Sequence, residues 1–131
     1  MTATNFYVYF ARGAADLDAA AAALPDHDLG ADRQGSELLI SVAGMRFRVT
    51  LEDTPAVAAE AAAAGRGTEF DAGMARCTAR FTVEVNDLEA ALEEITTMME
   101  LQGALQDSCS GFVFLPWNNG IIEPWVAGDG L

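Results

Sequence analysis

The stretch RCTARFTVEV, residues 76–85, alternates strictly between apolar and polar side chains. This period of two predicts a β-strand that turns one face to the core and the other away from it. The side chains expected to face the core are Cys77, Ala79, Phe81, Val83 and Val85. Those expected to face away are Arg76, Thr78, Arg80, Thr82 and Glu84. The chain should therefore contain a sheet with one buried face and one polar face.

A hairpin is expected before this strand, with arms at residues 37–43 and 45–51. Its second arm alternates in the same way. If both stretches share a sheet and an orientation, four arginines form one arginine-bearing face: Arg46, Arg48, Arg76 and Arg80. We expect these side chains to be exposed or paired with acids such as Glu84, because unpaired charges are rarely buried.

A second hairpin is expected at the end of the chain, with arms at residues 111–117 and 121–126. Its turn, residues 118–120, contains Asn-Gly, which is the strongest short hairpin signal. Pro116 and Pro124 cannot donate ladder hydrogen bonds. The hairpin should therefore lie at an edge of the sheet.

The first part of the chain predicts one more strand and a helix. Residues 5–11 carry apolar side chains on both faces, which is typical of an inner strand. Residues 14–24 have the spacing of an amphipathic helix, which Pro25 should end. The polar segment at residues 26–36 is expected to be a loop.

Two further helices are predicted from their start signals. Thr54 should cap, and Pro55 should open, a short alanine-rich helix that ends near Gly65. Asn86 and Glu89 resemble a capping box at the start of the longest helix. The core-facing stripe of that helix is expected to comprise Leu88, Ala91, Leu92, Ile95, Met98 and Met99.

These elements follow one another as β-α-β-β-α-β-α-β-β, and the first six match the ferredoxin-like βαββαβ pattern. We therefore predict an α+β fold with a single, mostly antiparallel sheet, a ferredoxin-like core, an added long helix and a C-terminal β-hairpin. Helices should cover one face of the sheet and leave the arginine-bearing face open. With 131 residues, of which 51% are hydrophobic, the chain should form one domain over residues 1–131.

The charge of the chain is strongly negative. Its seven basic residues are all arginine, and twenty acids oppose them, for a formal net charge of -13. Such a charge repels nucleic acid and anionic membranes, and it steers a basic protein partner toward the chain. Solubility alone, a saline habitat or a GC-rich genome would also produce it, and these alternatives stay open.

The sequence also predicts a location. No apolar run approaches the ~20 residues that a membrane-spanning helix needs. The first residues, MTATNF, lack the basic start of a signal peptide. We therefore expect a cytoplasmic protein.

Residues that carry catalytic or metal chemistry are scarce. The single histidine, His27, lies between Asp26 and Asp28, where it could hold a metal or act as a base. No second imidazole or cysteine lies at ligand spacing, so a solvated loop histidine is the favoured interpretation. Cys77 and Cys109 are expected to be small buried hydrophobes. We expect no catalytic residue, metal or cofactor.

Two features are candidates for binding a protein partner. Trp117 and Trp125 flank the turn region of the last hairpin, and tryptophan is enriched at interfaces. Both rings could equally cover the end of the core. Glu89, Glu93 and Glu100 form an acidic ridge on the longest helix.

A strand at residues 77–85, a helix at residues 88–105 and a closing segment at residues 111–120 with the triplet PWN occupy the second half of the chain. This arrangement resembles the carboxy-terminal half of small bacterial toxin-immunity proteins. The resemblance implies a cytoplasmic, non-enzymatic inhibitor that binds a toxin domain, and many such targets are basic nucleases. It transfers no functional residue to this chain.

The leading hypothesis is therefore a non-catalytic, acidic protein-binding domain of the immunity type. One alternative is a chaperone for a secreted effector, which would also be small and acidic and usually a homodimer. The other alternative is a small enzyme or ligand-binding domain with a pocket between the sheet and the long helix.

Overall fold

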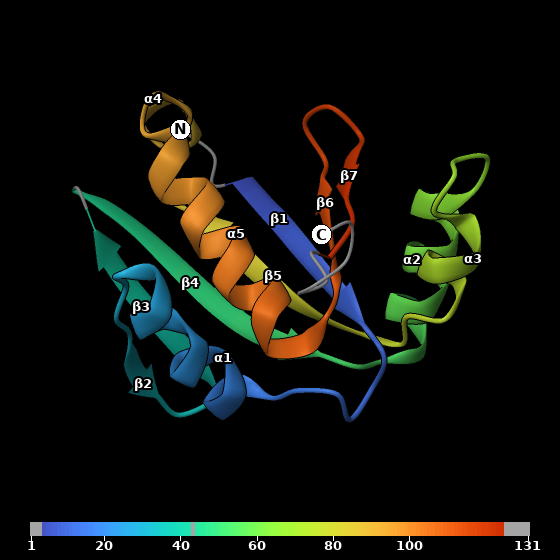
Figure 1. The fold of residues 1–131 in the computed structure, drawn as a ribbon, viewed down its shortest axis with the longest axis horizontal. Helices are drawn as coiled ribbons and strands as arrows, with labels where there is room; N and C mark the ends of the chain where they lie inside the picture. Colours follow the sequence, from blue (N-terminus) through green and yellow to red (C-terminus); the bar gives the residue numbers. More distant parts are fainter. Residues whose placement is uncertain (1–3, 43, 125–131) are drawn as a thin grey trace, which may run out of the picture.

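The computed structural model describes residues 4–42 and 44–124 of the chain. Within these residues, seven strands form one sheet in the order β2-β3-β4-β5-β1-β6-β7, and all neighbouring strands are antiparallel (Figure 1). The strands are β1 (Thr4–Phe10), β2 (Asp32–Gln34), β3 (Glu37–Val42), β4 (Met45–Glu52), β5 (Ala79–Val85), β6 (Phe112–Leu115) and β7 (Gly120–Ile122). The helices are α1 (Leu17–Ala23), the 3-10 helix η1 (Leu24–His27), α2 (Pro55–Gly65), α3 (Asp71–Ala75), α4 (Leu88–Glu93) and α5 (Ile95–Cys109). The predicted α+β class with a single antiparallel sheet is confirmed.

Strands β1 and β5 form the centre of the sheet. They pair along their whole length, from Thr4 opposite Val85 to Phe10 opposite Ala79. Strand β4 pairs with the other edge of β5, and β6 pairs with the other edge of β1. The core-facing side chains of the two central strands are buried: Phe6, Val8, Phe10, Ala79, Phe81, Val83 and Val85. The alternation predicted for residues 76–85 is thus confirmed from Ala79 onward.

The strand order differs from that of a simple ferredoxin-like fold. In the expected βαββαβ core, the first two strands are parallel and the third lies between them. Here both β4 and β5 separate β1 from β3. Strands β5 and β6 both run antiparallel to β1 and are therefore parallel to each other, so the split βαβ unit is formed by β5, α4, α5 and β6. The order of elements along the chain does not determine which edge of the sheet a crossover joins.

After α1 and η1, the chain enters the sheet at its far edge through β2, where the sequence predicts only a loop. All three residues of β2 are polar and exposed, so the sequence shows no alternation of apolar and polar residues that would predict a strand here. It runs from Asp32 opposite Leu39 to Gln34 opposite Glu37 and therefore covers only half of β3. Within the described chain, residues 40–42 of β3 have no strand on their outer side.

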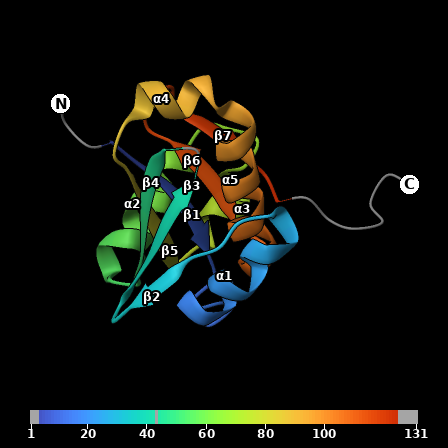
Figure 2. The same ribbon diagram turned by 90° about the vertical axis from the view of Figure 1, so that its left-hand side faces the viewer.

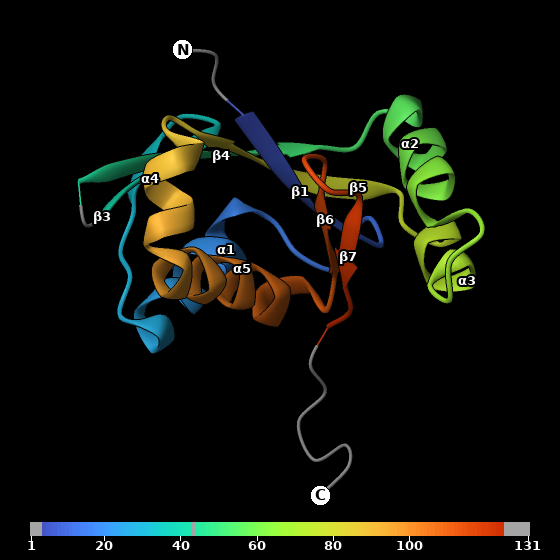
Figure 3. The same ribbon diagram turned by 90° about the horizontal axis from the view of Figure 1, so that it is seen from above.

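Helices cover both faces of the sheet, which corrects the expectation of helices on one face. Figure 2 shows α1 and α5 on one side of the strands and α2 on the other, and Figure 3 shows α2 and α3 at one end of the sheet. The larger core lies under α1, η1 and α5 and contains Leu24 and Leu105. A second, smaller core packs Val57 and Met74 against Tyr9. Strand β1 carries apolar side chains on both faces because one core lies on each side of it.

One predicted helix cap is wrong, and another is confirmed in position. Asn86 directs its side-chain oxygen to the backbone N–H of Arg46, at 2.8 Å, and so extends the contact between β4 and β5. Asp87 caps α4 instead, because its Oδ1 accepts from the backbone N–H of Ala90 at 3.1 Å. Thr54 is the N-cap residue of α2 and Pro55 opens the helix, as predicted, although the side chain of Thr54 makes no hydrogen bond to the helix. Because the side chain of Asn86 is bonded to β4, Asp87 becomes the cap and α4 begins at Leu88.

The last hairpin lies at the sheet edge, as predicted, with β7 outermost. Its strands are shorter than the predicted arms, and Leu115 pairs with Gly120 next to the turn. Asn119 has a φ of 56°, a left-handed conformation that asparagine tolerates well in turns. Residues 125 and 126 of the predicted arm lie outside the described residues.

The predicted arginine-bearing face holds three of its four members. The register sets Arg48 opposite Glu84 and Glu52 opposite Arg80, and opposite residues point to the same face, which Arg46 also shares. Arg76 is not part of it, because it follows α3 and precedes the start of β5. The face is open around Arg46 and Arg48, whereas α2 and α3 cover it around Arg80.

The guanidinium of Arg80 is almost completely buried, with 10% of the side chain exposed. Its Nε donates to Glu52 at 2.9 Å, and its Nη1 donates to Glu60 at 3.0 Å and to the hydroxyl of Tyr9 at 3.1 Å. The Cζ atom also lies 4.3 Å from the ring centre of Tyr7, within the range of a cation–π contact. One side chain thus connects β5 with β4, α2 and β1.

We expect Arg80→Ala to lower the free energy of unfolding by about 2–3 kcal/mol, because Glu52, Glu60 and Tyr9 lose their shared donor. This lies below the cost of breaking a fully buried pair, since Glu60 can still reach water. The measurement is urea unfolding followed by circular dichroism.

The matched control is Arg48→Ala on the same face, where the ion pairs are exposed and should contribute much less to stability than those of Arg80. Equal losses for the two variants would contradict the special role of Arg80.

Candidate functional site

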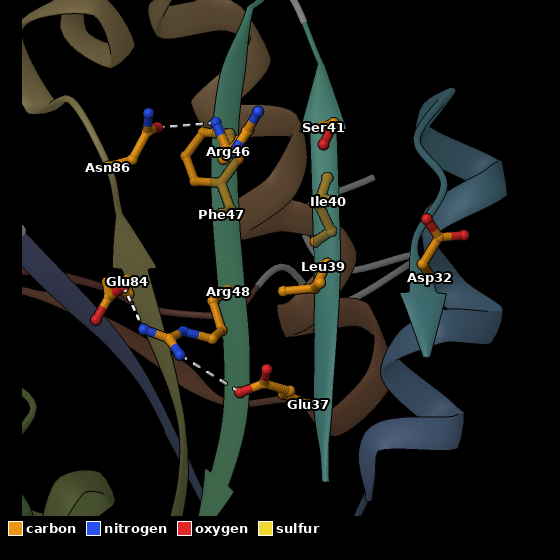
Figure 4. Close-up of a pocket in the computed structure, with 10 residues that line it drawn as sticks. All are labelled: Asp32, Glu37, Leu39, Ile40, Ser41, Arg46, Phe47, Arg48, Glu84 and Asn86. Carbon is orange, nitrogen blue, oxygen red and sulfur yellow. Dashed lines mark hydrogen bonds and ion pairs between the residues drawn. The ribbon is translucent and has the colours of Figure 1, made fainter. Parts of the chain in front are cut away.

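A hollow of about 510 Å³ lies over the open part of the sheet, on the face away from α5 (Figure 4). We call it the sheet hollow. Its polar side chains come from four strands and include Asp32 on β2, Ser41 on β3, Arg46 and Arg48 on β4, and Glu84 on β5.

The position of this hollow differs from the pocket that the ligand-binding alternative expects between the sheet and the long helix. That space is filled by fully buried side chains of α5, among them Leu101, Ala104 and Leu105. Any ligand site at the sheet hollow would therefore lie on the opposite face.

The charges in the sheet hollow are partly paired. Arg48 donates through Nη2 to Glu84 at 2.6 Å, and its Nη1 lies 3.7 Å from a carboxylate oxygen of Glu37. These acids, Glu84 first, raise the pKa of Arg48 above its ordinary value. The side chains of Arg46 and Asp32 make no ion pair or hydrogen bond with the described residues. With respect to residues 4–42 and 44–124, one cation and one anion of the hollow therefore remain unpaired.

A second candidate surface lies on α4 and α5, which the sequence predicts as one helix. The helix breaks at Glu94, whose φ of -106° and ψ of 51° are not helical, and the two parts meet at an angle (Figure 3). Leu92, Ile95 and Met99 are 44%, 45% and 59% exposed, so their predicted place in the core stripe is wrong. We call Leu92, Ile95 and Met99, together with Glu89 and Glu93, the α4–α5 face.

The predicted acidic ridge is divided by the same break. Glu89 and Glu93 are exposed on α4, one helical turn apart. Glu100 lies on α5, where its carboxylate accepts a hydrogen bond from His27. Glu89 and Glu93 thus make no ion pair with the described residues, whereas Glu100 is already engaged.

His27 is held between two carboxylates, which overturns its interpretation as a solvated loop residue. Its Nδ1 lies 2.8 Å from Glu100 and its Nε2 lies 2.7 Å from Asp107, both on α5, and the side chain is only 20% exposed. A Cβ on Gly103 would lie 3.3 Å from the ring, so the glycine leaves room for it. The hydrogen bond to Asp107, with a further contribution from Glu100, raises the pKa of His27 despite partial burial.

The structure describes only one of the two tryptophans that are candidates for binding a partner. Trp117 lies in the connection between β6 and β7, half-buried and packed against the larger core. This placement favours its role as a cover for the core over a role as an exposed anchor. Trp125 lies outside the residues that the structure describes.

The two cysteines are buried and free of disulfide bonds, as expected for small hydrophobes. Burial raises the pKa of Cys77 to about 11 and that of Cys109 to about 12, so both are thiols at neutral pH. Thiols are poor nucleophiles compared with thiolates. In the described part of the chain, no group of three or more His, Cys, Asp or Glu residues is placed to hold a metal ion.

Comparison with protein-family models, with curated proteins and with solved structures finds no match for this chain. No helix among the described residues is both long and apolar enough to cross a membrane. The function is therefore argued from the α4–α5 face and the sheet hollow.

The sequence pattern did not reveal the apolar residues of the α4–α5 face. Leu92, Ile95 and Met99 fit a continuous core stripe, and only the break at Glu94 turns them outward. The local signal for that break is weak: the residues that follow it, Ile95, Thr96 and Thr97, are all β-branched and lower the helix propensity.

We expect the His27 clamp to stabilise the fold in a pH-dependent way. Because the pKa of His27 is raised in the folded state, its contribution is fully present below the unfolded pKa of about 6.5. It is lost as the pH rises through the folded pKa. His27→Gln should cost on the order of 1 kcal/mol at pH 6 and progressively less at higher pH. Urea unfolding from pH 6 to pH 9 measures this difference.

Asp107→Asn is the matched test, because Asp107 makes the largest contribution to the raised pKa. It should remove most of the pH dependence that His27→Gln removes. A difference between wild type and His27→Gln that stays constant with pH would contradict the clamp.

Proposed function

We propose that the protein is a non-catalytic protein-binding domain whose partner is basic, and that the α4–α5 face is its docking surface. The observation that carries this proposal is the exposure of Leu92, Ile95 and Met99 within one eight-residue stretch. Among the described residues, they are three of five large hydrophobic side chains that are strongly exposed. A concentration of exposed apolar groups on a small, charged domain is typical of an interaction site.

The composition of the α4–α5 face fits a particular kind of partner. Apolar side chains at its centre would be desolvated on binding, while Glu89 and Glu93 beside them would stay near water at the rim. Methionine adapts its shape to different surfaces, which suits Met99 to a docking role. The complementary partner presents apolar side chains flanked by Lys or Arg, as on one face of a basic amphipathic helix.

The net charge of -13 supports the same partner at longer range. Such a field accelerates encounter with a basic protein and slows encounter with an acidic one. The resemblance of residues 77–120 to toxin-immunity proteins includes both α4 and α5, and inhibition of a basic toxin in the cytoplasm is the specific form of this proposal. The proposal does not depend on this resemblance, because it rests on the exposed residues of the α4–α5 face.

The docking surface is tested with a triple variant, Leu92→Ser, Ile95→Ser and Met99→Ser, used with wild type as bait in affinity capture from the source cells. All three side chains are exposed, so the fold should be retained. We expect a basic protein to be captured by wild type and to be lost with the triple variant, as removal of interface anchors can cost on the order of 2 kcal/mol or more.

The matched control is Leu51→Ser with Ile122→Ser, which removes two exposed apolar side chains that lie on strands, away from the α4–α5 face. The control should capture the same protein as wild type. Equal capture by the triple variant and the control would overturn the α4–α5 face as the docking surface.

Charge reversal gives a separate kinetic prediction for the captured partner. Glu89→Arg with Glu93→Arg should slow association by about tenfold at low salt, leave dissociation less affected, and lose this effect at high salt. Glu69→Arg with Glu123→Arg changes the net charge equally at other exposed sites and should slow association less. Surface plasmon resonance at two salt concentrations measures both, and equal slowing would show that only net charge matters.

A further inference from the structure

The sheet hollow has one end that is suited to an anion. Arg46 and Ser41 are opposite each other in the register of β3 and β4, so their side chains stand side by side on the open face. The side-chain oxygen of Asn86 accepts from the backbone of Arg46, which leaves its NH₂ group without a partner among the described residues. Figure 4 shows the three side chains at the same end of the hollow. A guanidinium, a hydroxyl and an amide NH₂ are together a donor set for a carboxylate.

The other end of the sheet hollow carries a free acid. Asp32 stands opposite Leu39 in the register of β2 and β3, and its carboxylate makes no ion pair with the described residues. Leu39 is half-buried and gives the floor between the two ends an apolar character. Glu37 lies on the same face but is already close to Arg48. Asp32 is therefore the group available to a cationic part of a ligand.

The spacing of the two ends limits the size of the ligand. Leu39 and Ser41 are two residues apart on one strand, or about 7 Å, and β2 and β4 are two strands apart, or about 10 Å. The free cation and the free anion are thus separated by roughly 12 Å at the level of the backbone. A ligand that reaches both ends must therefore be larger than a single ion.

Neither a simple anion nor a simple cation suits this site. The hollow is lined by three acids and only two arginines, a balance that disfavours a multiply charged anion such as a phosphate ester. A lone cation bound at Asp32 would give Arg46 no partner. A ligand that carries both a carboxylate and an ammonium satisfies both ends without leaving either charge unpaired.

We propose that the sheet hollow binds a small zwitterion of dipeptide size, with its carboxylate at Arg46, Ser41 and Asn86 and its ammonium at Asp32. The volume of about 510 Å³ is in the range of small-molecule sites. The site lies on the open face of the sheet, whereas α5 covers the other face, and it shares no residue with the docking surface proposed above.

The experiment is a titration of the ¹⁵N-labelled full chain with glycyl-leucine, followed by amide chemical shifts. We expect saturable shifts at Asp32, Ser41, Arg46 and Asn86, with a dissociation constant of about 1 mM or below. N-acetyl-glycyl-leucine, which lacks the ammonium, and glycyl-leucine amide, which lacks the carboxylate, should each bind at least about tenfold more weakly.

Two variants link the binding to the named residues. Arg46→Gln should weaken binding of glycyl-leucine about tenfold, and Asp32→Asn should weaken it several-fold. Arg66→Gln and Asp26→Asn change exposed charges outside the hollow and should leave the dissociation constant unchanged. All four side chains are exposed, and the dispersion of the amide spectrum reports that each variant is folded.

Three results would overturn the proposal. The first is the absence of shifts up to roughly 20 mM glycyl-leucine. The second is equal binding of the acetylated dipeptide, which would make the hollow a general anion site. The third is saturable shifts confined to other parts of the protein.

Discussion

The buried guanidinium of Arg80 is the constraint on which the arrangement of the second sheet face depends. A charge on an inner strand can be removed from water only where partners surround it, and these partners come from β1, β4 and α2. Tyr7 supplies a ring beneath the cation, and Tyr9 supplies both a hydroxyl and an apolar surface for Met74 and Val57. The apolar contacts of Val57 and the ion pair of Glu60 together hold α2 over this end of the sheet.

This local cover leaves the rest of the same face exposed. Arg46 and Arg48 lie on the same side of the sheet as Arg80, but no helix among the described residues lies above them. The sheet hollow is therefore the uncovered part of a single polar face. On the other side, the break at Glu94 gives α4 a direction different from that of α5, and apolar side chains that a straight helix would bury reach the surface. The two candidate surfaces have separate origins in the fold.

Local pattern predicted the elements that bury one face and missed those defined by distant contacts. The alternation in β4 and β5, the inner position of β1 and the edge position of the last hairpin are each encoded in neighbouring residues. Strand β2 has no apolar residue, and α3 has only five residues, so neither has a period to detect. The fate of Arg80 and His27 depends on residues 20 to 80 positions away, such as Glu60 and Asp107. Among the predicted site residues, Glu89 and Glu93 are exposed as expected. The sequence pattern placed the apolar residues beside them, Leu92, Ile95 and Met99, in the core.

The shortness of β2 has a consequence for self-association. Residues 40–42 of β3 present backbone donors and acceptors along an uncovered margin of the sheet, where a strand from another molecule could add. At neutral pH, the net charge of -13 keeps such copies apart. Acidification neutralises the carboxylates while every arginine stays charged, so the net charge falls toward zero. Intermolecular β-pairing would then begin at this edge of β3. At neutral pH, the excess of acids prevents such pairing through electrostatic repulsion between copies.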